Sequence, residues 1–183
     1  MLTMCQKNGL CLNHYKLDVG LGHSLFANAG KTYKASDTGD VYAVPVSPLR
    51  LLLALAWLNS VPVDWLSRQM IQINVSLTYV YRLPMPQPAD DEIRANPDFL
   101  QLAKNALLLT LAASWDDFAD LAPLLVVAKN DVPVTTKAQD QLRAENDKIV
   151  ARLYGITDAE FSHLLNSFNG MANKRPEYVA LLQ

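Results

Sequence analysis

The longest apolar run in the chain lies between Leu49 and Leu58, where Arg50 is the only charged residue. A helix with apolar side chains on nearly every side is expected to be buried on nearly every side. Ser47 and Pro48 precede this run; serine is a favoured N-cap, and proline suits the first helical position. We therefore predict a helix that begins at Pro48 and is the most buried element of the protein.

A second helix and a strand are predicted next. Val63, Leu66 and Met70 recur at the spacing of one helix face, which indicates a helix over about residues 62–70. Apolar and polar side chains then alternate from Ile73 to Tyr81. A period of two residues is typical of a strand with one buried face.

The first 46 residues have the pattern of short strands and turns. Asn8 and Gly9 separate two segments that contain apolar residues, which is a hairpin signal. The segment Val41–Val46 is interpreted as a short strand, and Pro45 places it near the edge or the end of a sheet. We therefore expect this part of the chain to be rich in β structure.

Helical patterns return after a proline-rich connector. The prolines of residues 83–96 predict extended backbone there. Asn96 precedes Pro97 and is expected to cap a long helix. Ser114 is expected to start a short helix, and Thr136 to cap a helix that runs to Tyr154.

The chain is expected to turn a corner at Gly155. Glycine takes a left-handed backbone conformation without a Cβ penalty and often follows the last helical residue. Thr157 and Glu160 have the spacing of a capping box, which predicts that another helix starts at once and ends near Gly170. The buried face of that helix is predicted to consist of Phe161, Leu164, Leu165 and Phe168.

Together these patterns predict an α+β fold. A small mixed β/helix part is expected over residues 1–88, and a mostly α-helical part over residues 89–183. The chain has 183 residues, of which 50% are hydrophobic. This is enough for one domain of ordinary size or for two small ones.

The charge of the chain limits the possible partners. A net charge of −2 and a pI near 5.9 do not favour a free-standing DNA-binding domain, which is usually basic. No signal peptide is apparent, and the apolar run is far shorter than the roughly 20 residues of a membrane helix. We therefore expect a cytoplasmic protein without a membrane partner.

A metal site is not expected. Cys5 and Cys11 are too few for a disulfide framework and suit a reducing compartment. With His14 they offer three soft ligands, but structural zinc normally has four ligands at tighter spacing. Free thiols are the preferred interpretation. The acidic segment Asp90–Glu92 is interpreted as a solvated charge run in the connector.

Two short motifs are similar to catalytic loops, but each lacks a required glycine. The segment Ala29–Thr32 (AGKT) would end a P-loop, yet Leu25 stands where the first glycine belongs. The segment Gly22–Phe26 (GHSLF) lacks the closing glycine of a nucleophile elbow. No catalytic residue is therefore assigned, and a hydrolase that uses Ser24 or Cys5 is the weaker alternative.

Three separated segments carry a more specific pattern. They are LALAWLNSVPVDWLSRQM (53–70), NVSLTYVYRLPMPQP (74–88) and LRAENDKIVARLYGITDAEFSHLLNSF (142–168). In order and spacing they resemble the C-terminal target recognition region and helical tail of large type II restriction–modification N6-adenine DNA methyltransferases. The matching residues are Leu58, Asn59, Ser60, Asp64, Trp65, Leu83, Pro84, Pro86, Leu142, Arg143, Ala144, Glu145, Asp147, Val150, Ala151, Arg152, Leu153, Tyr154, Gly155, Thr157 and Glu160.

This resemblance implies a function. In such enzymes an upstream domain transfers a methyl group from S-adenosylmethionine to adenine N6, and some also carry a nuclease. The C-terminal region chooses the DNA sequence. The chain is thus expected to be a DNA sequence recognition segment that positions double-stranded DNA for an upstream methyltransferase domain of the same chain. It would bind no cofactor itself. The resemblance also limits the second expected strand to about Gln72–Val75.

The residues expected to contact DNA lie where the second helix meets the strand, and in an early loop. Arg, Gln and Asn side chains can pair with base edges, and Lys side chains can neutralise phosphates. The candidates are Arg68, Gln69, Gln72, Asn74 and Ser76 for the bases, and Lys31 and Lys34 for the phosphates.

Two alternatives stay open. Glu145, Asp147 and Arg152 could form a polar site, but their helical spacing favours ion pairs where helices pack. The alternative function is a protein-interaction or scaffold helical module without DNA binding. In that case the apolar helix at 51–58 and the side chains of Trp57, Trp65 and Trp115 would belong to an interface rather than to a core.

Overall fold

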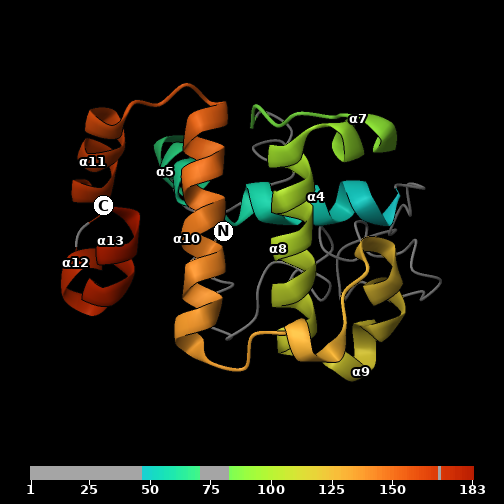
Figure 1. The fold of residues 1–183 in the computed structure, drawn as a ribbon. Coiled ribbons are helices and arrows are strands. Elements are labelled where there is room, and N and C mark those ends of the chain that lie inside the picture. The colour runs from blue at the N-terminus through green and yellow to red at the C-terminus, as the bar shows by residue number, and fades with distance from the viewer. Residues whose placement is uncertain (1–46, 71–82, 169) are drawn as a thin grey trace, which may run out of the picture.

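The computed structural model describes residues 47–70, 83–168 and 170–183, whose arrangement is shown in Figure 1. Of these residues 77% are helical, and none of them forms a strand. The α+β prediction is therefore wrong for the described part of the chain, which is mostly α. The strands expected at 41–46 and 72–75 and the hairpin at Asn8 lie outside the described residues.

The described part is a series of short and medium helices joined by tight turns. In chain order the elements are α4 (Pro48–Leu58), α5 (Val61–Met70), α7 (Asp90–Ala95), α8 (Pro97–Ala113), α9 (Trp115–Phe118), the 3-10 helices η2 (Ala119–Leu125) and η3 (Lys129–Asp131), α10 (Thr136–Leu153), α11 (Asp158–Asn166), α12 (Met171–Lys174) and α13 (Pro176–Leu182). The short helices α12 and α13 were not predicted, and the helix expected to end near Gly170 is α11, which ends at Asn166.

Helix α4 is buried along its length, as predicted. Every side chain from Leu51 to Leu58 is at most 8% exposed. Ser47 Oγ accepts a hydrogen bond from the backbone N–H of Arg50 (3.2 Å), which confirms the predicted N-cap. Helix α4 packs mainly on α8 and also contacts α5, α7 and α10. In Figure 1 it runs across the upright α8.

No single helix among the described residues is long and apolar enough to cross a membrane. Within the same residues, α4 and α5 are the one pair that together reach the necessary length and composition, and this pair is bent by 67°.

Two apolar clusters hold the helices together, and α10 contributes to both. The main core surrounds α4 and α8 and receives Ile149 and Val150 from α10. The C-terminal core consists of Val61, Ala144, Ala151, Phe161, Leu164, Leu165, Tyr178 and Leu182. Successive residues of an α-helix point about 100° apart, so α10 can present different side chains to the two clusters. Helix α10 therefore lies between the two cores and contributes side chains to both.

The proline-rich connector contains a helix, α7, which corrects the extended backbone predicted there. Asp91 and Glu92 are exposed, as expected for a solvated charge run, and Asp90 is partly buried. These carboxylates occupy the first turn, where the helix dipole favours negative charge. Glu92 Oε2 accepts a hydrogen bond from the backbone N–H of Ala89 (2.7 Å), and Asp90 accepts one from Ser47 Oγ (2.5 Å). Carboxylates at a helix start therefore outweigh the extended tendency of the neighbouring prolines.

The starts of the two long helices lie at or beside the expected residues. Asn96 Oδ1 accepts a hydrogen bond from the backbone N–H of Asp98 (2.9 Å), which confirms the cap of α8. Helix α10 is capped by Thr135 rather than by Thr136, because Thr135 Oγ1 accepts from the backbone N–H of Ala138 (3.2 Å).

The corner at Gly155 is confirmed. The φ angle of Gly155 is 71°, in the left-handed region. Its N–H donates to the carbonyl of Arg152 (2.9 Å), and the N–H of Ile156 donates to that of Ala151 (3.0 Å). This pair of bonds is a Schellman motif, which satisfies carbonyls at the end of α10.

The capping box that follows is also confirmed. Thr157 Oγ1 accepts from the N–H of Glu160 (3.3 Å), and Glu160 Oε2 accepts from the N–H of Thr157 (2.8 Å). Hydrogen bonds from the Thr157 backbone and side chain lower the pKa of Glu160. Adjacent stop and start signals therefore fix the sharp turn between α10 and α11.

Replacing Gly155 with valine is expected to lower the free energy of unfolding by about 1 kcal/mol or more. A Cβ at this position would meet no atom within 4 Å, so the cost comes from the backbone angle alone. Gly155→Asn is the control, since asparagine tolerates the left-handed region better than valine. Urea denaturation measures both variants, and equal stabilities of wild type and Gly155→Val would contradict the corner.

Candidate functional site

Among the described residues, the most deeply buried acidic group is the carboxyl group of Asp147, on α10. Asp147 is only 2% exposed. Asp147 Oδ1 accepts a hydrogen bond from the backbone N–H of Val61 (2.7 Å), and Oδ2 accepts one from the hydroxyl of Tyr178. Val61 is the first residue of α5, where an N–H group has no partner within the helix. One carboxyl group thus joins α5, α10 and α13.

Burial raises the pKa of Asp147 to about 7. The hydrogen bonds from Tyr178 and Val61 and the positive charge of Arg175 act in the opposite direction, while the negative charge of Asp64 adds to the increase. Burial and the neighbouring Asp147 also raise the pKa of the Tyr178 hydroxyl well above its ordinary value. The pair therefore holds its protons more firmly than either group would in water.

A second carboxylate on α10 anchors the segment before α13. Asp140 Oδ1 accepts hydrogen bonds from Arg143 (2.9 Å) and from Arg175 (2.8 Å). The guanidinium of Arg175 also lies over the ring of Tyr178, 4.2 Å from its centre. Arg175 therefore links the Asp140 ion pairs to the Asp147–Tyr178 pair.

Tyr154 closes a second junction at the C-terminal end of α10. Its hydroxyl donates to the carbonyl of Pro84 (2.6 Å) and accepts from Trp57 Nε1 (2.7 Å). The rings of Tyr154 and Trp57 meet edge to face with centres 5.3 Å apart, and Phe99 meets Trp57 in the same way at 6.5 Å. Burial raises the pKa of Tyr154. The junction fixes the segment before α7 against α4 and α10.

Helices α8 and α10 meet through a third junction, which is made of amides. Asn105, fully buried on α8, donates from Nδ2 to Glu145 Oε2 and to Asn146 Oδ1, both at 2.9 Å. Gln101 Nε2 in turn donates to Asn105 Oδ1 (3.0 Å). Buried amides that lose their partners cost stability, so this junction favours one register of α8 on α10.

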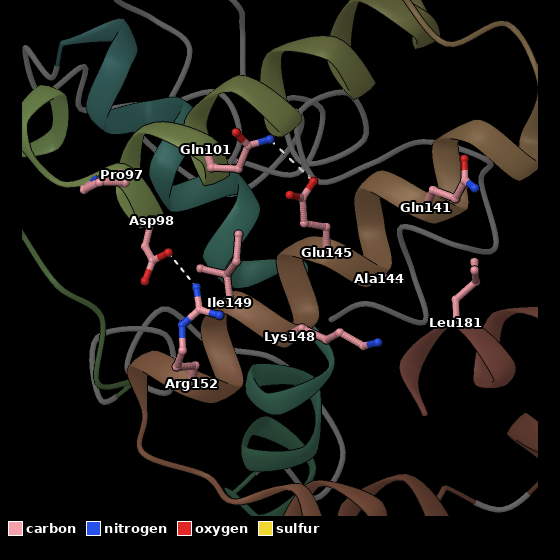
Figure 2. Close-up of a pocket in the computed structure, with 10 residues that line it drawn as sticks. All are labelled: Pro97, Asp98, Gln101, Gln141, Ala144, Glu145, Lys148, Ile149, Arg152 and Leu181. Atoms are coloured by element: carbon pink, nitrogen blue, oxygen red, sulfur yellow. Dashed lines mark hydrogen bonds and ion pairs between the residues drawn. The ribbon is translucent and has the colours of Figure 1, made fainter.

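A shallow groove of about 550 Å³ lies along α10, between the start of α8 and the end of α13. Figure 2 shows Asp98 and Gln101 of α8 on one side of it and Leu181 of α13 on the other. Its lining residues are Pro97, Asp98, Gln101, Gln141, Ala144, Glu145, Lys148, Ile149, Arg152 and Leu181. Arg152 crosses one end of the groove and pairs with Asp98 at 2.6 Å. Two acidic and two basic side chains therefore line the groove.

The residues Glu145, Asp147 and Arg152 do lie where helices pack, but only Arg152 forms an ion pair. Glu145 and Asp147 accept hydrogen bonds from neutral groups of other helices instead: an Asn105 amide for Glu145, and the Val61 N–H for Asp147. Helical spacing alone could not reveal this difference, because the partners come from distant parts of the chain.

The described residues offer little for covalent chemistry. The buried hydroxyls of Ser60, Ser67 and Thr110 each donate to a backbone carbonyl within their own segment. His163, the histidine within the described ranges, is exposed on α11. No group of three or more His, Cys, Asp or Glu side chains in those ranges is arranged to hold a metal ion. Cys5 lies outside them, so the alternative nucleophiles are not placed.

Two of the candidate DNA contacts are described, and they lie together near the C-terminal end of α5. Arg68 pairs with Asp64 (2.9 Å), and its guanidinium lies over the ring of Phe168 at 5.0 Å. Half of the Arg68 side chain is exposed. Gln69 is exposed, and its amide is 3.5 Å from the carbonyl of Trp65. The remaining candidates, Gln72, Asn74, Ser76, Lys31 and Lys34, lie outside the described residues.

Charge is unevenly divided along the chain. The described residues carry eleven Lys and Arg against fifteen Asp and Glu, whereas the other 59 residues carry five against three. The described part of the chain is therefore acidic, and the rest of the sequence is weakly basic. A polyanion would be repelled by the first and attracted by the second.

The Tyr154 junction can be tested by removing one oxygen. Tyr154→Phe is expected to lower the free energy of unfolding by about 1 kcal/mol, because Trp57 Nε1 and the Pro84 carbonyl lose their partner. Arg152→Gln is the comparison, since it breaks a more exposed ion pair and is expected to cost less. Urea denaturation of both variants decides; a Tyr154→Phe protein as stable as wild type would contradict the junction.

Comparisons of the chain with protein-family models, with curated proteins and with solved structures each found no match. What the protein does is therefore inferred from its own residues and their contacts.

Proposed function

We propose that this chain is a DNA sequence recognition segment of a larger restriction–modification N6-adenine methyltransferase, and that the described helices are its scaffold. The observation that supports this proposal is the meeting of the three segments that carry the resemblance. Val61 of the first segment binds Asp147 of the third, and Pro84 of the second binds Tyr154 of the third. Trp57 of the first also binds Tyr154.

A scaffold role agrees with how the matching residues are used. Arg152 forms an ion pair between two helices, and Gly155 turns the chain at the end of α10. Thr157 and Glu160 form the capping box that starts α11. Ser60 donates to the carbonyl of Trp57 at the end of α4. Residues with such roles hold a surface in place rather than react. Methyl transfer from S-adenosylmethionine would then belong to an upstream domain of the parent enzyme, which in some such enzymes is accompanied by a nuclease.

The contacts to DNA are assigned to the end of α5 and to the more basic part of the chain. Phosphate contacts dominate protein–DNA affinity, and the acidic helical body is poorly suited to make them. Lys31 and Lys34 are proposed for the phosphates. Base edges would be read by Arg68, Gln69, Gln72, Asn74 and Ser76, of which the first two belong to α5 and the others follow it in the chain. Such a protein would work in the cytoplasm.

A second candidate function is a protein-interaction or scaffold helical module without DNA binding. The excess of acidic side chains in the described helices favours it. The two candidates differ in a simple way, because only the first involves an affinity for DNA that depends on salt.

Binding of a short fluorescein-labelled DNA duplex, followed by fluorescence anisotropy at low salt, separates these candidates. The wild-type chain is expected to bind weakly, and Lys31→Glu combined with Lys34→Glu is expected to weaken binding about tenfold or more. Lys104→Glu combined with Lys137→Glu is the matched control. It makes the same change in net charge on exposed positions of α8 and α10 and is expected to weaken binding by less than about threefold.

Two results would contradict the recognition role. One is an absence of binding even at low salt, which would favour the interaction module. The other is an equal loss of binding in the two double variants, which would show that Lys31 and Lys34 have no particular part. Transfer of a labelled methyl group from S-adenosylmethionine by the purified chain would contradict the assignment of chemistry to an upstream domain.

A further inference from the structure

The last two helices form a strap across α10. We use the name C-terminal strap for α12 and α13, residues 171–182. Helix α13 packs mainly on α10 and on α12. It contributes Tyr178 and Leu182 to the C-terminal core, and its seven residues are too few to form a stable helix alone. Its position therefore depends on a small number of contacts with α10.

The polar part of this contact centres on a carboxyl group that lies under the strap. Tyr178 of α13 donates to Asp147, and Arg175 at the start of α13 pairs with Asp140. On the opposite side, Asp147 accepts from the Val61 N–H of α5. If α13 moved away, Asp147 would lose its Tyr178 partner and gain water.

The groups that act on Asp147 come from every side. Helix α5 supplies the Val61 N–H and the negative charge of Asp64, and α13 supplies Tyr178 with Arg175 beside it. Helix α10 itself carries Arg143, whose charge acts on Tyr178, and Asp140, which pairs with Arg143 and Arg175. Helix α8 meets this stretch of α10 through the neutral amide of Asn105. Helix α11 keeps its titratable side chains Asp158, Glu160 and His163 exposed.

We propose that the C-terminal strap is a pH-sensitive closure, which stays docked on α10 while Asp147 is protonated and opens more readily once Asp147 is ionised. An ionised carboxylate under the strap lacks water, and the two hydrogen bonds it accepts do not replace full hydration. Opening of α13 is the local movement that restores water to it. Opening also uncovers Leu182 and Ala144 and removes Leu181 from one side of the groove.

The sign and size of the effect follow from linkage. The docked form holds the proton with a pKa of about 7, whereas an open form returns Asp147 towards its ordinary value of 3.8. The docked form therefore binds more protons in this interval, so its stability relative to the open form falls as the pH rises from about 4 to about 7 and levels off above that, where both forms are ionised. For a docked pKa near 7 the closed-to-open ratio drops about tenfold between pH 6 and pH 8.

Hydrogen exchange read by mass spectrometry tests this closure on the full chain. Protection factors at pD 6 and pD 8, corrected for intrinsic rates, are compared between peptides of α13 and of α8. In wild type, protection of α13 is expected to fall about tenfold between the two conditions, while that of α8 stays constant. In Asp147→Asn the fall in α13 is expected to vanish, because the amide keeps an acceptor for Val61 but does not ionise.

Two further variants keep the test decisive. Leu182→Ala is expected to lower the protection of α13 by the same factor at both values of pD, since it removes apolar contact and no charge. Tyr178→Phe is expected to lower protection while retaining the dependence on pD, because Asp147 stays buried. The proposal is overturned if wild-type α13 is equally protected at both values, if Asp147→Asn keeps the dependence, or if α8 loses protection in parallel with α13.

Discussion

The carboxyl group of Asp147 needs hydrogen-bond partners from two directions, because α10 places it in the buried interior, where the residue is 2% exposed. On one side it meets the first N–H of α5, and on the other the hydroxyl of Tyr178. Burying a charge is costly unless it finds such partners. The positions of α5 and α13 relative to α10 are therefore linked to one another. The C-terminal core, which takes residues from α5, α10, α11 and α13, is built around this arrangement.

The same helix connects this core to the larger one. Val150 points into the main core, while its neighbour Ala151 belongs to the C-terminal core. The Tyr154 junction and the amides around Asn105 fix the other sides of α10. In the proposed function such rigidity matters more than reactivity, since a recognition surface must hold its contacts at a fixed distance from an upstream catalytic domain. In this proposal the acidic described helices serve as the scaffold, and the candidate DNA contacts read and hold the DNA.

Local signals in the sequence predicted many element ends correctly. Ser47, Asn96 and the pair Thr157–Glu160 act through partners within three residues, so spacing alone reveals them. The Asp147 junction could not be found in this way, because Val61 lies 86 residues and Tyr178 31 residues away in the chain. The α+β fold class was wrong for the described residues, which are mostly helical, and the strands it expected lie outside them. Carboxylates also start a helix, α7, where an extended connector was expected.

The central claim is that Asp147 and Tyr178 act as one unit that joins α5, α10 and α13. A double-mutant cycle of Asp147→Ala and Tyr178→Phe, measured by urea denaturation at one fixed pH, tests it most directly. The expected coupling energy is about 1 kcal/mol or more, whereas a cycle on the exposed pair of Asp98 and Arg152 is expected to give less than about 0.5 kcal/mol. Additive effects of the two substitutions, within about 0.3 kcal/mol, would contradict the claim.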